Sequence, residues 1–153
     1  MIAAMKNTPP GWPRISSSLY YADARKAIAW LAEAFGFELR LLVDGEDGSV
    51  RHSELTYGEG VIMVSDGASH EAMGRTPPSK VGGANTQNLM VYVDDVDAHH
   101  ARAIAAGATI TEPLSVHDYG EAYWTDRSYG VKDLGGHAWW FTQRIRDPKP
   151  AAK

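Results

Sequence analysis

The sequence predicts an α+β fold built from two copies of a βαβββ unit. Three observations predict it. An alternating strand segment, an amphipathic helix and three further strand segments follow one another in that order. The same order recurs about 71 residues later, and a stretch rich in Gly, Pro and Ser separates the two copies. The chain has 153 residues, of which 44% are hydrophobic and 22% charged, as is typical of a globular domain.

The first unit begins with a strand candidate at 15–21, after which Asp23 is expected to cap a helix. Apolar residues recur at helical spacing from Ala24 to Phe35, and Gly36 is expected to end the helix. Turn-forming residues separate the three strand candidates that follow, at 37–43, 50–57 and 61–65.

The second unit repeats this order. A strand candidate at 89–93 precedes a helix at 96–106, which Asp94 or Asp95 would cap and Gly107 would stop. The separation from Asp94 to Gly107 is 13 residues, equal to that from Asp23 to Gly36. Further strand candidates lie at 108–112, 124–132 and 138–143, and a polar loop containing His117 is expected between the first two.

These elements predict one domain at 1–146 and a flexible tail at 147–153. Within the domain, module one spans about 14–66, a linker about 67–86 and module two about 87–143. A loop as long as this linker is uncommon in a compact domain and is usually functional or mobile.

Charge and composition exclude several partner classes. The net charge is −4 and no Lys/Arg-rich run occurs, which argues against nucleic acid and anionic membranes. No stretch of roughly 18 apolar residues is present for a membrane span, and the start does not resemble a secretory signal. The chain has no cysteine, which agrees with a reducing compartment, so we expect a cytoplasmic protein.

Three segments resemble the glyoxalase/bleomycin-resistance/dioxygenase superfamily. They are the first helix region from Tyr20 to Phe37, the second helix region from Val91 to Ala108, and the segment Asp126–His137, in which Leu134 replaces the usual proline. The resemblance covers about 15–143. It implies paired βαβββ modules whose curved mixed sheets form a cup, with the helices on the outer face, in a homodimer.

The resemblance also implies where a metal would bind. Metal-using members place His or Glu side chains on the first and fourth strand of each module. The matching places here hold Ser16, Met63, Asn88 and Trp140. Neither these residues nor their immediate neighbours are His, Asp or Glu, so no set of lone-pair donors can converge on a divalent ion. We therefore expect no metal and no other cofactor.

His52 and Glu54 share one side of the strand at 50–57. If Leu55 packs under the helices, both face the cup, where a histidine beside a carboxylate could act as a general acid/base pair. An edge or interface ion pair is the alternative interpretation.

The same alternation predicts a lining for the cup and an aliphatic set on the opposite side. Aromatic, thioether, hydroxyl and amide groups suit a planar or apolar organic molecule, although they could instead fill the cup as a closed core. Arg127 could pair with a carboxylate or phosphate of a ligand, or else with Asp126 or Asp133. The predicted ligand-binding residues are Ser18, Tyr20, Met63, Asn88, Met90, Tyr92, Arg127 and Trp140.

Two functions follow as hypotheses. The first is a protein that sequesters or acts on an aromatic or apolar small molecule without a metal, as the resemblance to the bleomycin-resistance branch implies. The alternative is a metal-dependent lyase, isomerase or dioxygenase of the same superfamily that uses displaced ligands, for example His52, Glu54 and His137. The sequence leaves open whether any reaction is catalysed, and an orphan domain with a filled cup is a third possibility.

Overall fold

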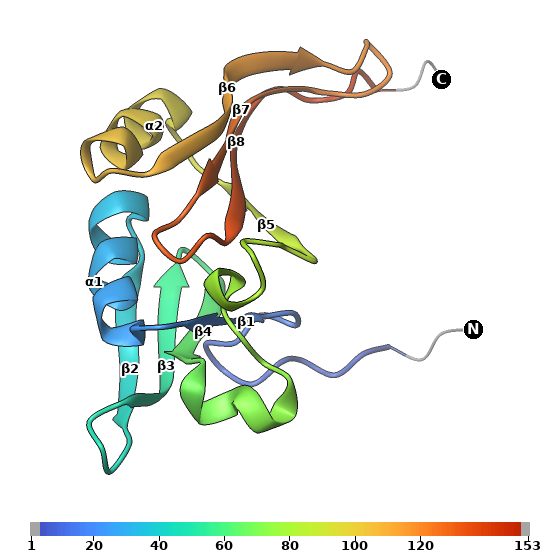
Figure 1. The fold of residues 1–153 in the computed structure, drawn as a ribbon. Helices are drawn as coiled ribbons and strands as arrows, with labels where there is room; N and C mark the ends of the chain where they lie inside the picture. Colours follow the sequence, from blue (N-terminus) through green and yellow to red (C-terminus); the bar gives the residue numbers. More distant parts are fainter. Residues whose placement is uncertain (1–3, 151–153) are drawn as a thin grey trace. The chain divides into compact units, whose positions relative to one another are not determined.

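The computed structural model describes residues 4–150, and Figure 1 shows the order of its helices and strands. The chain divides into two compact units. Unit one comprises the described residues up to Ala32 together with Gly36–Thr76, and unit two comprises Glu33–Phe35 together with the described residues from Pro77. Each unit contains one four-stranded sheet.

Module one consists of β1 (Ser17–Tyr21), α1 (Ala24–Phe35), β2 (Glu38–Asp44), β3 (Val50–Tyr57) and β4 (Gly60–Asp66). Its strands lie in the order β1-β4-β3-β2. The first strand pairs in parallel with the last, whereas the other neighbours are antiparallel.

Module two consists of β5 (Asn88–Tyr92), α2 (Val96–Ala105), β6 (Thr109–Asp118), β7 (Thr125–Lys132) and β8 (Ala138–Arg146). Its order, β5-β8-β7-β6, and its one parallel pair match those of module one. The predicted fold class is therefore confirmed as α+β, with two βαβββ modules that each form a mixed sheet.

The structure differs from the expected elements in two places. The linker contains two short 3₁₀ helices, η1 (Ala68–Met73) and η2 (Pro78–Lys80). The strand β6 continues through Pro113 to Asp118, so His117 lies in a strand and not in a loop. Pairing survives the proline because the register of β6 on β7 shifts between Glu112 and Ser115, where a missing N–H is tolerated.

The tail predicted at 147–153 is partly ordered in the structure. Residues 147–150 have no regular secondary structure, and residues 151–153 lie outside the described residues. Lys149 nevertheless donates its backbone N–H to the carbonyl of Glu121 over 3.2 Å. Within residues 4–150, neither α-helix is long and apolar enough to cross a membrane.

The two sides of β1, and likewise of β8, differ in burial. In β1, Leu19 and Tyr21 are only 5% and 1% exposed, whereas Ser18 between them is exposed. In β8, Trp139 and Phe141 are buried while Trp140 between them is half-buried. We call the other side of each sheet, which carries Ser18 in module one and Trp140 in module two, the open face. The period-2 alternation of side chains explains the division.

An aspartate begins each helix. Asp23 Oδ1 accepts a hydrogen bond from Lys26 N over 3.0 Å, and Asp95 Oδ1 accepts one from Ala98 N over 3.0 Å. These bonds satisfy backbone N–H groups that have no partner inside the helix. Asp95, and not Asp94, is thus the cap of α2. The helix α1 ends at Gly36, whose φ of 81° favours a residue without a Cβ atom.

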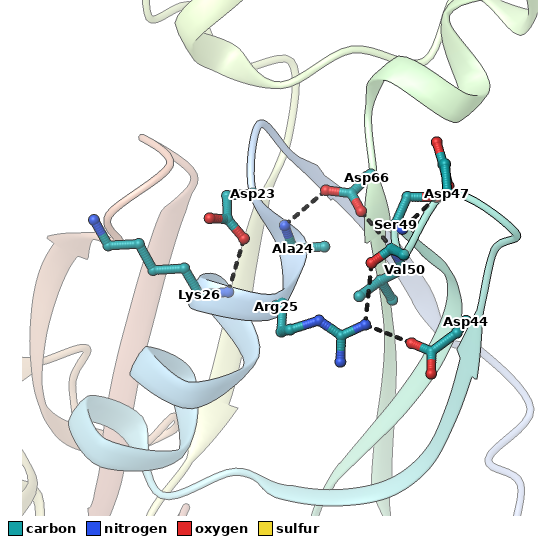
Figure 2. A network of polar contacts seen from close by, with 10 residues as sticks. Asp23, Ala24, Arg25, Lys26, Asp44, Asp47, Ser49, Val50 and Asp66 are labelled. Atoms are coloured by element: carbon teal, nitrogen blue, oxygen red, sulfur yellow. Dashed lines mark hydrogen bonds and ion pairs between the residues drawn. The ribbon is translucent and has the colours of Figure 1, made fainter.

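Asp66, at the end of β4, ties three elements of module one together (Figure 2). Its Oδ1 accepts a hydrogen bond from Ala24 N in α1 over 2.8 Å, and its Oδ2 accepts one from Val50 N in β3 over 2.6 Å. Arg25 adds an ion pair with Asp44 beside it. In module two a neutral side chain replaces this aspartate, because Gln143 Oε1 accepts from Val96 N over 3.0 Å.

A buried histidine organises the core of unit two. His99 of α2 is 7% exposed and lies 4.1 Å, between ring centroids, from Phe141. Its Nε2 lies 2.9 Å from the carbonyl oxygen of Phe35, and its Nδ1 lies 2.7 Å from the hydroxyl of Tyr129. Since a carbonyl only accepts, Nε2 carries the proton and Nδ1 accepts from the tyrosine. Burial lowers the pKa of His99 by more than the bond to Phe35 raises it.

Substituting Asp66→Asn should destabilise the fold, because one carboxylate oxygen would become an amide that donates and faces a backbone N–H. We expect the free energy of unfolding, measured in urea, to fall by about 1–3 kcal/mol. The exposed Glu59→Gln is the control and should change it by less than about 0.5 kcal/mol. Equal stabilities of the two variants would contradict the role of Asp66.

The buried His99 should make the stability depend on pH. In the unfolded chain its pKa is about 6.5, and in the folded chain it is lower. Between the two values the unfolded chain binds more protons, so stability is full above about pH 6.5 and is lost as pH falls towards the folded pKa. In His99→Gln the melting temperature should decline less between about pH 7 and pH 5 than in the wild type. His100→Gln is the control, and an unchanged slope in His99→Gln would contradict the assignment.

Candidate functional site

The open face of module one brings together five of the predicted site residues. The register pairs Ser18 with Met63 across β1 and β4, and Glu54 with Met63 across β3 and β4. The Ser18 hydroxyl lies 4.0 Å from the sulfur of Met63. Tyr20 and His52 share the parity of Ser18 and Glu54 on their strands, so they lie on the same face.

Glu54 is the centre of a polar network on this face. Its Oε1 lies 3.3 Å from His52 Nε2, and its Oε2 lies 2.9 Å from Arg40 Nε and 2.8 Å from Arg40 Nη2. Arg40 Nη1 also donates to the carbonyl of Gly11 over 2.6 Å, and its guanidinium stacks on the ring of Trp12 at 5.0 Å. Both carboxylate oxygens are therefore engaged by donors.

The Glu54 side chain is 12% exposed. Burial raises the pKa of Glu54, but hydrogen bonds from His52 and Arg40 and the charges of these groups outweigh it, so the pKa lies below its usual value. The carboxyl group is therefore ionised at neutral pH and acts as an acceptor. As a proton donor it would be poor.

Tyr20, also on the open face of module one, is held from the linker side. Arg75 donates to its hydroxyl over 3.1 Å and lies 5.9 Å from its ring centroid. His70 of η1 lies 5.2 Å from the same ring. The linker predicted to be functional or mobile thus contacts a predicted ligand-binding residue.

The open face of module two carries the other predicted lining residues. The register pairs Asn88 with Ala138 and Met90 with Trp140. Met90 and Tyr92 are 58% and 50% exposed, unusually high values for such large side chains in a sheet. His117 of β6 meets Trp140 edge to face, with ring centroids 6.5 Å apart.

An arginine also sits among aromatic rings and carboxylates on this face. Arg144 Nε donates to Asp126 Oδ1 over 2.6 Å, and its Nη2 donates to the hydroxyl of Tyr92 over 2.8 Å. Its guanidinium lies 5.6 Å from the ring of Tyr92 and 5.1 Å from that of Trp124. Asp147 accepts a further bond from Nη1 over 3.1 Å. This cation orients Tyr92 and neutralises the buried Asp126.

Arg127 lies on the other side of the sheet. It alternates with Asp126 on β7 and shares the parity of Tyr129, which is fully buried and bonded to His99 of α2. Its guanidinium binds Asp97 of α2 through two bonds of 3.0 and 2.8 Å. The hydrogen bond from Arg127 lowers the pKa of Asp97. The partners considered from the sequence, Asp126 and Asp133, were therefore wrong, and Arg127 is not beside the lining residues of module two.

The four places where the resemblance implies metal ligands offer a hydroxyl, a thioether, an amide and an indole. Such groups do not form the ligand set of a divalent ion. Nor do residues 4–150 contain any cluster of three or more His, Asp or Glu side chains that could hold one. Ser16, immediately before β1, has a buried Oγ with no hydrogen-bond partner among the described residues.

His137 takes part in the hydrogen bonding of the turn between β7 and β8. Its backbone N donates to Asp133 Oδ1 over 3.0 Å, and its Nδ1 lies 3.3 Å from the same oxygen. Asp133 Oδ2 accepts from the indole of Trp139 over 3.0 Å. These bonds shape the turn between β7 and β8.

A separate groove of about 560 Å³ lies in unit one, beside the β2–β3 turn and η1. Its lining includes Glu46, Asp47, Arg51 and His70, a mixture of both charges that favours no particular ligand. The predicted lining residues are not part of it.

Sequence reasoning missed several residues of the two open faces: Trp12, Arg40, Arg75, Trp124, Asp126 and Arg144. Trp12 and Arg75 lie outside the strands, where alternation says nothing about direction. Arg40 and Arg144 are long side chains whose guanidinium groups reach a carboxylate on a neighbouring strand. Alternation along a strand does not indicate where the end of such a long side chain lies.

Comparison with known proteins gives consistent results. A family model described as the Glyoxalase/Bleomycin resistance protein/Dioxygenase superfamily matches residues 14–141. An uncharacterised protein of Mycobacterium bovis is 32% identical over 136 residues, which is 88% of this chain and 86% of that protein.

Solved structures show the same fold. The crystal structure of TioX from Micromonospora sp. ML1 has a TM-score of 0.64 and 36% identity, covering 86% of this chain and 95% of that one. A glyoxalase-related enzyme from Fulvimarina pelagi has a TM-score of 0.62 at 17% identity, with 85% and 87% coverage. At that lower identity the likeness concerns the fold alone.

Substituting Arg144→Met should lower the urea midpoint of unfolding, because Asp126, whose side chain is only 10% exposed, would lose its counter-charge. Arg25→Met is the matched control, since Arg25 and Asp44 are 51% and 59% exposed and such surface pairs contribute little. A midpoint in Arg144→Met no lower than in Arg25→Met would show that the open-face pair has no structural role.

Proposed function

The chain belongs to the Glyoxalase/Bleomycin resistance protein/Dioxygenase superfamily, and on that premise we propose that it binds an aromatic or apolar organic molecule on the open faces of its sheets without a metal. The observation that carries the proposal is the exposure of large apolar and aromatic side chains there. Met90 and Tyr92 are 58% and 50% exposed, whereas Leu89 and Val91, which alternate with them along β5, are half-buried. Thioether and aromatic groups with few hydrogen-bonding groups suit a planar ligand.

The polar groups on the same faces favour a neutral ligand. Glu54 is paired with Arg40, and Asp126 is paired with Arg144, so each face holds compensated charge. Neither an anion nor a cation gains an unpaired counter-charge from these pairs. Selectivity would then come from stacking and from a small number of hydrogen bonds.

The absence of a metal belongs to this proposal. It is supported by the chemistry of the four matching places, where Ser16, Met63, Asn88 and Trp140 provide no carboxylate or imidazole. We propose further that the protein works as a homodimer in the cytoplasm, as the family resemblance and the lack of cysteine led us to expect. A role of His52 and Glu54 as a general acid/base pair stays a prediction.

A neutral aromatic probe tests the binding function. We expect 2-methoxynaphthalene to raise the melting temperature and to bind in a fluorescence titration. Tyr20→Ala in module one and Trp140→Ala in module two should weaken binding roughly tenfold, which corresponds to about 1.4 kcal/mol for a lost aromatic contact. Arg127→Met is the control and should bind like the wild type, because its guanidinium is engaged with Asp97. Equal affinity in all variants would contradict the site.

Metal dependence is tested separately. Protein purified without a chelator should contain less than stoichiometric zinc, nickel, iron or manganese by mass spectrometry. Its affinity for 2-methoxynaphthalene should not change after treatment with EDTA, because stacking and dispersion need no ion. One tightly bound metal per chain, whose removal abolishes binding, would overturn the metal-free proposal.

A further inference from the structure

His52, on the open face of module one, has one ring nitrogen that is engaged within the protein and one that is not. Its side chain is 37% exposed, and it pairs in register with Val43 on β2. One ring nitrogen, Nε2, is engaged with Glu54 over 3.3 Å. Among the described residues, none forms a hydrogen bond with the other nitrogen, Nδ1.

The partner of Nε2 determines which nitrogen carries the proton. Glu54 is ionised, because hydrogen bonds and charges from its neighbours keep its pKa low despite burial. An ionised carboxylate only accepts, so Nε2 must donate and must carry the ring proton. In the neutral imidazole, Nδ1 is then an unprotonated acceptor.

Glu54 is itself held in place from the other side. Arg40 engages its second oxygen through Nε and Nη2 over 2.9 and 2.8 Å. Arg40 is fixed in turn by the Gly11 carbonyl over 2.6 Å and by the ring of Trp12 at 5.0 Å. The carboxylate therefore has little freedom to turn away from His52 or to offer an oxygen to a ligand.

We propose that His52 recognises a hydroxyl group of an aromatic alcohol or enol by accepting its proton in a hydrogen bond at Nδ1. Glu54 and Arg40 are positioning residues, and they do not touch the ligand. This inference rests on the proposed binding function, which it narrows to ligands that carry a neutral, mildly acidic donor. Imidazole is a stronger acceptor than a serine hydroxyl or a thioether, which are also neutral groups on this face, and it favours acidic donors.

Two fluorescent probes that differ only in the donor test the inference. 2-Naphthol has a hydroxyl group, whereas 2-methoxynaphthalene has the same rings and cannot donate. At about pH 8 the wild type should bind 2-naphthol about threefold to tenfold more tightly, as one net hydrogen bond implies. His52→Phe should bind both probes equally, and the control His100→Phe on α2 should keep the preference.

The tautomer of His52 can be measured without any ligand. Ring ¹⁵N chemical shifts in long-range ¹H–¹⁵N spectra, assigned by comparison with His52→Phe, should show the Nε2–H form. In Glu54→Gln the amide can either accept or donate, so a mixture of both tautomers should replace the single form. A merely structural role of Glu54 would not change this readout.

The outcomes separate this inference from the function on which it rests. If both probes bind equally to the wild type, or if His52→Phe keeps the preference for 2-naphthol, the inference is overturned and the binding function stands. If neither probe binds, the proposed function fails and the inference fails with it. A predominant Nδ1–H tautomer in the wild type would overturn the inference by itself.

Discussion

The parallel pairing of the first strand of each module with its last strand determines which side chains face away from the buried core. Because the pairs are in strict register, Ser18 lies beside Met63 and Met90 lies beside Trp140 on the open faces. The same register puts Ile62 and Val64 of β4, and Trp139 and Phe141 of β8, on the buried faces. A shift of one residue would exchange the two sets of side chains. Burial of the apolar set therefore selects the register, and the register determines which residues lie on the open face.

In both modules an arginine neutralises a carboxylate that has little exposure, although the residues differ. In each, an arginine donates to the hydroxyl of an open-face tyrosine, Arg75 to Tyr20 and Arg144 to Tyr92. In each, a carboxylate on the third strand of the module is paired with an arginine, from β2 in module one and from β8 in module two. A carboxylate with little exposure would otherwise be costly in a sheet lined with apolar groups. The arginines therefore make an apolar open face compatible with acidic residues.

Buried and open faces use polar groups for different purposes. On the buried side, Asp66, Asp133 and His99 form hydrogen bonds with backbone groups and core side chains, and these bonds hold elements together. On the open face, Glu54 is saturated by its neighbours, whereas His52 keeps one ring nitrogen for an external partner. Because both oxygens of Glu54 already accept hydrogen bonds, the histidine, and not the carboxylate, is the group that can form a hydrogen bond with a ligand. This distinction comes from the distances and could not come from the residue types.

The sequence by itself determined the two βαβββ modules, the cap of α1 and the parity of the strands, because these depend on local periodicity and on capping chemistry. It left Asp94 and Asp95 as alternatives for the cap of α2, which the structure assigns to Asp95. It also predicted that His52 and Glu54 share one side of β3, and the register that pairs Glu54 with Met63 puts this side on the face of Met63. Tertiary structure alone decided the partners of long charged side chains. Arg127 pairs with Asp97 of α2, and Arg40 reaches Glu54 on the neighbouring strand. A flexible side chain several bonds long can choose among charges brought close only by folding, and strand periodicity contains no information about that choice.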